Sequence, residues 1–185
     1  MLKKRILLLA LSAVLLACGT AAADKFGYPV DLETMKMLEE QSSFAVRVTE
    51  KKVVLENYDV ETFSDEGADA LVITVTNGSD SEITSLEVGF IAVTEEGKTT
   101  DVVRNWDISI GGTPEIKRLV RSDMNLAPGD KTELVARVDY SCFKGVRAMV
   151  ISCRLADGSV LKNPDYEQWK NYAYGLTSEN TTELD

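Results

Sequence analysis

Between residues 44 and 162 the chain alternates apolar and polar side chains, and this period of two constrains the fold more than any other feature. The runs cover 44–48, 52–55, 69–76, 86–92, 98–104, 116–120, 133–140 and 146–155. Turn sequences such as Asn77-Gly78, Glu96-Gly97 and Asp157-Gly158 separate them. No helical period lies between the central runs, which argues against a parallel α/β sheet. Seven to nine short strands separated by turns predict a mainly β protein, an antiparallel β-sandwich over residues 43–163.

Two short helices are predicted at the ends of the sandwich. Asp31 can cap an N-terminal helix over residues 31–42, with Met35 on its apolar stripe. Pro164 suits the start of a C-terminal helix over residues 164–175. A polar, acidic tail over residues 176–185 follows and is predicted to be disordered.

The C-terminal helix carries an aromatic stripe, Tyr166, Trp169 and Tyr172, at three-residue spacing. Aromatic side chains bury a large area, so we interpret the stripe as the face that docks on the sandwich. The alternative is an exposed platform that stacks on sugar or peptide.

The N-terminus has the order of a secretory signal. Three basic residues precede an apolar run over 6–16, which ends in Leu15-Leu16-Ala17-Cys18. The run is about half the ~20 residues that span a bilayer. With the cysteine directly after Ala17, it resembles a bacterial lipoprotein signal. That resemblance implies a signal peptide over residues 1–17, a diacylglyceryl group on Cys18, a tether over residues 18–30 and a protein anchored on the extracytoplasmic face of the cell membrane. The alternative is an ordinary signal peptide with a chance cysteine.

Charge and composition exclude several function classes. The chain has a net charge of −10, and removal of residues 1–17 leaves 17 basic against 30 acidic residues. Nucleic-acid binding rests on lysine and arginine, so no nucleic-acid partner is expected. The chain has no histidine, which excludes the Ser-His-Asp and Cys-His nucleophile systems and most zinc sites. We predict no cofactor, no metal and no catalytic residue.

Cys142 and Cys153 raise the question of a disulfide in an exported protein. If 142–145 turns a hairpin, Cys153 lies opposite Leu134, about 26 Å from Cys142 at ~3.3 Å per residue. A disulfide needs Cα atoms within about 7 Å. Both cysteines fall on the apolar faces of their strands, Cys153 with Met149 and Ile151. We interpret them as small core residues, and a different strand pairing would leave the disulfide open.

Two loop regions are candidate sites. Acidic residues cluster over 59–69, and clustered carboxylates can bind calcium. The ordered Asp-x-Asp-x-Asp-Gly loop is absent, so we interpret the cluster as a solvated loop. Trp106 and Asp107 begin a Gly-rich stretch. Because loops often carry binding function, we predict these two residues as a ligand-binding pair.

At residues 77–98 the chain resembles the FxLYD-type immunoglobulin-like domains of bacterial lipoproteins. Asn77 and Ser79 fit the family's Asn-x-Ser turn, Phe90 its strand, and Gly97-Lys98 its hairpin. Residues 92–94 depart from Leu-Tyr-Asp. The resemblance covers about residues 44–174. It implies an immunoglobulin-like sandwich and carries over no catalytic residue. The aromatic helix over residues 166–174 is similar to that of uncharacterised lipoproteins of Gram-positive anaerobes.

Together these features predict a membrane-anchored, non-enzymatic binding module, held through a lipid on Cys18, with an envelope protein or a glycan as its partner. One alternative is an enzyme that uses carboxylates on glycans. The other is a structural accessory subunit of an envelope complex. A sandwich does not decide among them, since one fold hosts many functions.

Overall fold

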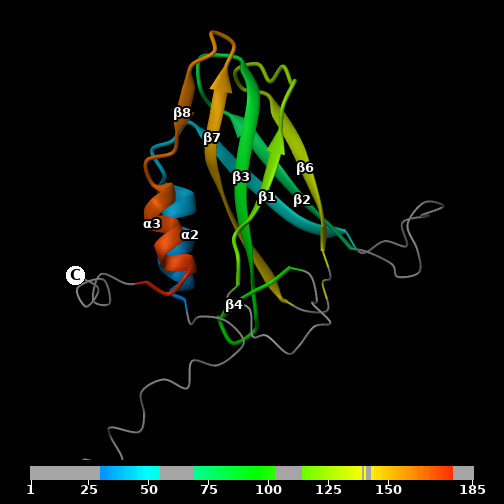
Figure 1. Cartoon of the computed structure of the whole chain (residues 1–185), viewed down its shortest axis with the longest axis vertical. Helices are drawn as coiled ribbons and strands as arrows, with labels where there is room; N and C mark the ends of the chain where they lie inside the picture. Colours follow the sequence, from blue (N-terminus) through cyan, green and yellow to red (C-terminus); the bar gives the residue numbers. More distant parts are fainter. Residues whose placement is uncertain (1–29, 55–68, 103–113, 139, 141–142, 177–185) are drawn as a thin grey trace, which may run out of the picture.

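The computed structural model describes residues 30–54, 69–102, 114–138, 140 and 143–176 (Figure 1). In chain order the described elements are α2 (Leu32–Gln41), β1 (Val46–Val54), β2 (Asp69–Asn77), β3 (Ile83–Val93), β4 (Thr99–Thr100), β5 (Lys117–Arg121), β6 (Lys131–Val138), β7 (Gly145–Leu155), β8 (Val160–Lys162) and α3 (Tyr166–Ala173). Both predicted helices are confirmed. Asp31 caps α2, where its side chain accepts a hydrogen bond from the Thr34 amide at 3.0 Å.

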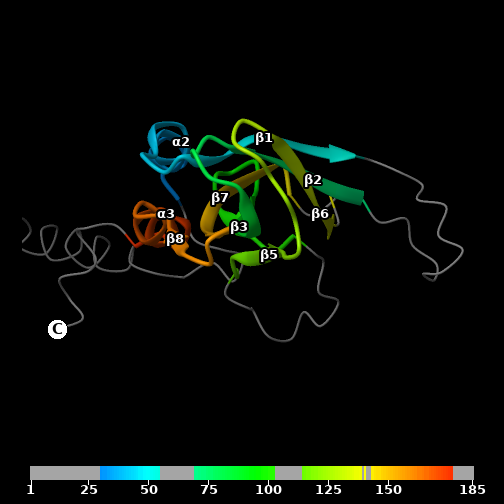
Figure 2. The ribbon, with the colours of Figure 1, turned by 90° about the horizontal axis from the view of Figure 1, so that it is seen from above.

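The strands form two antiparallel sheets that pack face to face (Figures 1 and 2). One sheet has the order β1-β2-β6. In the other, β3 pairs with β7 along one edge and with β4 and β5 along the opposite edge, and β8 completes the sheet beyond β7. The molecule is therefore mainly β, an antiparallel sandwich with two short helices, as the alternation predicts.

The main core lies between the two sheets. Alternate residues of the central strands point into it, among them Leu71, Ile73 and Val75 of β2 and Leu86, Val88 and Phe90 of β3. On β6, Leu134 and Val138 are buried in the same core. The inner face predicted for residues 133–140 is thus confirmed. Cys153 also lies here as a free, buried thiol, and burial raises its pKa above 9.0.

A second apolar cluster covers the outer face of the β3–β7 sheet. Met35 of α2 and three residues of α3, Tyr166, Trp169 and Ala173, pack there against Ile91 and Met149. Figure 2 places α2 and α3 together beside β7. The side chain of Trp169 is fully buried, so the docked interpretation of the aromatic stripe is confirmed and the exposed platform is wrong.

Two buried asparagines hold the ends of the sandwich. Asn77 donates to the carbonyls of Ser81 and Leu126, both at 2.9 Å, and accepts from the Ser79 hydroxyl at 2.6 Å. Asn163 donates to the Val150 carbonyl at 2.9 Å and accepts from the Asp165 amide at 3.0 Å. These bonds satisfy polar groups that would otherwise be costly to bury.

The start of α3 is also tied to the end of α2. The Asp165 carboxylate accepts from the Ser42 hydroxyl at 2.7 Å and from the Ser43 amide at 3.1 Å. The two helices therefore form one covering layer rather than two independent additions.

Three strand predictions need correction. Residues 44–48 and 52–55 do not form two strands, because β1 is continuous and a bulge near Thr49 shifts its register. Residues 142–145 do not join paired strands: β6 pairs with β2 and β7 with β3, so Cys153 lies opposite Leu86.

The third correction concerns the faces of β7. Met149 and Ile151 pack against the helices, whereas Cys153 faces the core between the sheets. A register shift between the pairs Glu87–Ser152 and Val88–Val150 inserts one extra residue into β7. The extra residue reverses the alternation. Cys142 lies outside the described residues.

Candidate functional site

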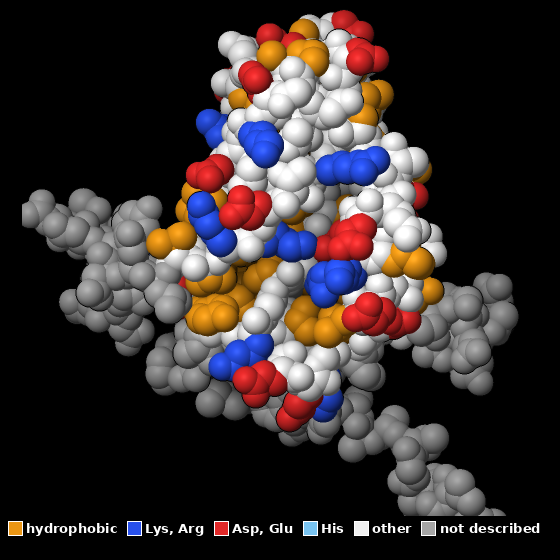
Figure 3. All heavy atoms as spheres, turned by 180° about the vertical axis from the view of Figure 1, so that it is seen from behind, with side chains coloured by type: hydrophobic (Ala, Val, Ile, Leu, Met, Phe, Trp, Pro, Cys, Tyr) orange, Lys and Arg blue, Asp and Glu red, His pale blue; other side chains and the backbone are white. Residues whose placement is uncertain are grey.

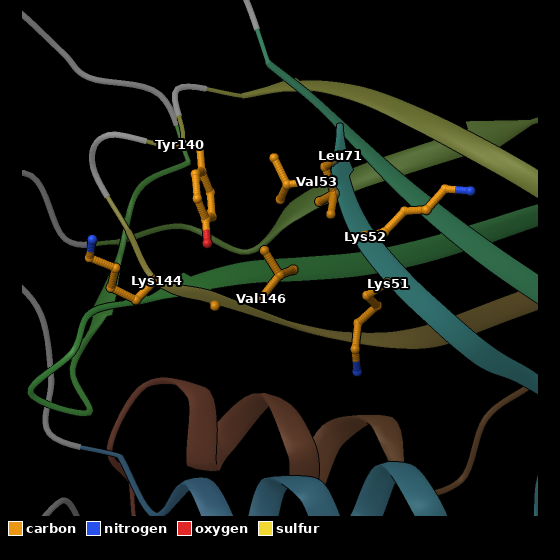
Figure 4. A pocket seen from close by; sticks show the side chains of 8 residues that line it. Lys51, Lys52, Val53, Leu71, Tyr140, Lys144 and Val146 are labelled. Atoms are coloured by element: carbon orange, nitrogen blue, oxygen red, sulfur yellow. The ribbon is translucent and has the colours of Figure 1, made fainter. Parts of the chain in front are cut away.

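A solvent-open hollow lies at the end of the sandwich where β1 ends and β7 begins. Its volume is about 360 Å³, at the lower end of the range for small-molecule sites. The lining residues are Lys51, Lys52 and Val53 of β1, Leu71 of β2, Tyr140, and Lys144, Gly145 and Val146 at the start of β7. Figure 4 shows these side chains around the opening.

The floor of the hollow is aliphatic. Val53, Leu71 and Val146 meet there, and all three belong to the core between the sheets or pack against it. The hollow therefore has an apolar surface that stays in contact with solvent.

Tyr140 forms one wall. Its ring lies edge-on to Phe143, with centroids 5.3 Å apart and planes at 89°, a favourable aromatic geometry. Its amide donates to the Asp69 carboxylate at 3.0 Å. Its hydroxyl points over the hollow in the direction of Val146 (Figure 4) and has no hydrogen-bond partner among the described residues.

The three lysines have different partners. Lys52 lies 3.7 Å from Glu133 and Lys144 lies 3.6 Å from Glu95, and all four of these side chains are largely exposed. Such surface pairs contribute ~1 kcal/mol or less. The ammonium of Lys52 turns away from the hollow, whereas that of Lys51 points toward the helices (Figure 4).

Lys51 belongs to a largely buried polar cluster beside the hollow. Glu39 of α2 lies 2.6 Å from the Lys51 ammonium and 3.5 Å from the Arg147 guanidinium. Its other oxygen accepts from the Trp169 indole at 3.1 Å. Only 9% of the Glu39 side chain is accessible. One carboxylate thus joins α2, α3, β1 and β7, and two cations share it.

The face with β1 and α2 is mixed in charge. Figure 3 views the molecule from that side, and basic and acidic side chains are interspersed there around exposed hydrophobic ones. The chain as a whole has a net charge of −10. Four cationic side chains, Lys51, Lys52, Lys144 and Arg147, gather around this one end, and each has a carboxylate partner.

Most of the residues predicted from sequence as functional lie outside the described residues. This holds for Cys18, for Trp106 and Asp107, and for positions 59–68 of the acidic cluster. Asp69, the last member of that cluster, holds the backbone of Tyr140. Within the described residues, no group of three or more acidic or cysteine side chains could hold a metal ion, and no helix is long and apolar enough to cross a bilayer.

The hollow itself was missed by sequence reasoning. Lys51 and Lys144 are far apart in the chain, and only the packing of β1 against β7 brings them to one opening. The available signal was weak: basic residues that interrupt apolar strand ends in a chain rich in Asp and Glu. Tyr140 was assigned to the core face, and it does pack against the core while its hydroxyl reaches the hollow.

These features define an antiparallel β-sandwich with a two-helix cover and a lysine-rimmed hollow. Residues 70–175 match the family of unknown function DUF5780, and because the match spans more than half of the chain, the chain belongs to this family. It is also similar to the 1.85 Å X-ray structure from Peptoclostridium difficile 630 of a hypothetical protein. The identity is 15% and the TM-score 0.46, over 77% of this chain and 98% of that one. No curated protein matches the sequence.

Proposed function

We propose that this chain is a lipid-anchored, extracytoplasmic, non-enzymatic binding module and that the hollow between β1 and β7 is its binding site. The observation that supports a binding role is an aliphatic surface left open beside cationic side chains. The anchor is supported by Leu15-Leu16-Ala17-Cys18 after the apolar run. Eleven residues lie between Cys18 and Val30, so the twelve Cα–Cα steps of the tether reach at most about 40 Å.

The finer relationship to FxLYD-type immunoglobulin-like domains is part of this proposal. Asn77 and Ser79 form the hydrogen-bonded turn that the resemblance leads one to expect. Gly97, with a φ of 74°, lies in a hairpin closed by the Thr94 amide and the Lys98 carbonyl at 2.8 Å. A positive φ favours glycine, so the Gly-Lys turn has a physical reason.

A binding role is favoured over a carboxylate-based enzyme by the contacts of the acidic residues around the hollow. Glu39 is engaged by Lys51, Arg147 and Trp169 together. Glu95 and Glu133 pair with lysines at the solvent-exposed rim. A general acid or base needs an oxygen within hydrogen-bond reach of the substrate. These contacts favour a structural use for Glu39, and they place Glu95 and Glu133 at the exposed rim and not on the floor.

The anchor is tested by fractionation of cells that express wild type, Cys18→Ala or Cys153→Ala. We expect wild type and Cys153→Ala in the membrane fraction and Cys18→Ala in the soluble or secreted fraction, because two acyl chains hold a protein on a membrane. Cys153→Ala is the matched control, since it removes a different thiol. Membrane retention of Cys18→Ala would contradict the anchor.

The binding site is tested by capture of envelope glycans and proteins on wild type and on Val146→Glu, which places a carboxylate on the aliphatic floor of the hollow. Loss of a captured ligand in the variant, with an unchanged circular-dichroism spectrum, supports the site. Turnover of a polysaccharide would favour the enzyme. Co-purification of an envelope protein that Val146→Glu leaves unchanged would favour the structural accessory subunit.

A further inference from the structure

We propose that the hollow between β1 and β7 recognises a small carboxylate with an aliphatic body. The inference rests on the proposed function, because it names the ligand class of the same site. It follows from three properties of the lining residues: an aliphatic floor, a hydroxyl that has no partner among the described residues, and an exchangeable ammonium.

The floor selects an alkyl group. Val53, Leu71 and Val146 offer only aliphatic carbon, and each methylene that leaves water against them favours binding. Sugar recognition normally uses the face of an aromatic ring. Tyr140 is the only aromatic residue in the lining, and its orientation is fixed by the edge-on contact with Phe143.

The walls select an anion. The Tyr140 hydroxyl points over the floor and has no partner among the described residues, so it can donate to a bound oxygen. Among the described residues the Lys144 ammonium has an ion pair with Glu95 alone, at 3.6 Å, and both side chains are more than half exposed. Because such a pair is weak, the flexible ammonium can exchange Glu95 for a ligand carboxylate.

Lys51 gives the hollow a polar edge and not a free charge. It shares Glu39 with Arg147, and the Asp69 carboxylate lies beside Tyr140. The preference for an anion therefore rests on Lys144 and on the Tyr140 hydroxyl.

The same walls favour a carboxylate over a phosphate. Phosphate sites in proteins commonly use the fork of an arginine or the amides at a helix N-terminus. The lining contains neither an arginine nor a residue of α2 or α3. One hydroxyl and one mobile ammonium match a singly charged group better than a doubly charged one.

The test is a titration followed by NMR of the valine and leucine methyl groups, with hexanoate as the probe. The protein is full length, and it is held in nanodiscs if it carries lipid. We expect saturable shifts confined to Val53, Leu71 and Val146 and their neighbours. Hexanamide, which lacks the charge, and acetate, which lacks the body, should each bind on the order of tenfold more weakly, and added salt should weaken hexanoate.

Three variants locate the interaction. Tyr140→Phe should weaken hexanoate on the order of tenfold, the usual effect of losing a hydrogen bond to a charged group. Val146→Glu, which places a carboxylate on the floor, should abolish saturation, and the remaining methyl signals report whether the fold is intact. Lys131→Gln removes an exposed lysine at the far end of β6, opposite Thr76, and should bind as wild type does.

Equal binding of hexanamide, tighter binding of hexyl phosphate, full affinity in Tyr140→Phe, or an absence of methyl shifts would each overturn the inference. The proposed function fails separately. Membrane retention of Cys18→Ala removes the anchor but leaves the titration unaffected. Conversely, if hexanoate does not bind while Val146→Glu still abolishes capture of an envelope ligand, the ligand class is wrong and the binding module stands.

Discussion

The two outer faces of the sandwich bury their outward-pointing residues in different ways. On the β3–β7 sheet, Ile91 and Met149 point outward, and the two helices cover them with Trp169 fully buried. On the β1-β2-β6 sheet, Val72 and Thr74 of the central strand point outward and are also more than nine-tenths buried. The described residues place no helix over this second face (Figure 2).

The cover of the second face comes from its own edge strands. Lys52 on β1 lies opposite Val72, and Glu133 on β6 lies opposite Thr74. Their side chains meet at 3.7 Å, so the pair must pass over β2. A face with small or β-branched residues in its central row can thus be closed by long side chains, whereas one with large apolar residues needs another layer.

The largest difference between the faces should be found by truncating their covers. Trp169→Ala should reduce the free energy of unfolding by roughly 3–5 kcal/mol, the usual cost of removing a buried aromatic side chain. Val135→Ala, at a side chain 55% exposed on the open face, should change stability by less than about 0.5 kcal/mol. Urea unfolding measures both, and similar effects would mean that the helices are not a packed layer.

A smaller effect is expected where the helix layer approaches the sheet most closely. A Cβ at Gly89 of β3 would lie 3.1 Å from Ile116 and 3.2 Å from the Tyr166 ring. Gly89→Ala should therefore destabilise the protein by about 1–3 kcal/mol through overpacking. Gly145→Ala is the matched control, because its Cβ meets open space. Thermal melting compares them, and a Gly89→Ala variant as stable as the control would show that α3 shifts freely.

Most of the sandwich and its helix cover could be predicted from the sequence. Residues 88–93 of β3 read Val-Gly-Phe-Ile-Ala-Val, apolar on both faces, which is what a sheet between two packed layers requires. The aromatic spacing of α3 predicted the layer that covers it. The turns at Asn77, Gly97 and Gly158 were recognisable because asparagine and glycine there have specific backbone roles.

The sequence predicted neither the strands with which β6 and β7 pair nor the candidate site. β6 and β7 are adjacent in the chain and alternate as a hairpin does, yet they lie in different sheets. The bulge in β7 adds one residue without a sequence signal of its own, and it reversed the face assigned to Cys153. The hollow depends on both pairings, because it opens between the end of β1 and the start of β7.

The helix-covered face should also lose stability at high pH, because it buries a tyrosine hydroxyl. Burial under the helix layer raises the pKa of the Tyr166 phenol above its ordinary value of 10.0. The folded state favours the neutral phenol, so this contribution to stability is complete below the unfolded pKa and is lost as the pH rises through the folded pKa. Urea unfolding from pH ~8 to ~11 should decline less steeply in Tyr166→Phe than in wild type. Parallel curves for wild type and Tyr166→Phe would contradict the assignment.

The smallest effect concerns the ion pair over the open face. Lys52→Met and Glu133→Gln, alone and together, form a double-mutant cycle, and we expect a coupling energy below about 1 kcal/mol because both side chains are about half exposed. The coupling should shrink further in high salt.

Beneath the pair, the Thr74 hydroxyl is buried without a hydrogen-bond partner in the described structure. Thr74→Val should therefore stabilise the protein by about 1 kcal/mol, since it removes an unsatisfied polar group while keeping the shape. Thr76→Val is its control, because the Thr76 hydroxyl has a partner in Thr49 at 3.0 Å. If Thr74→Val destabilises the protein instead, the hydroxyl is satisfied in solution, and the pair leaves that part of the face open to water.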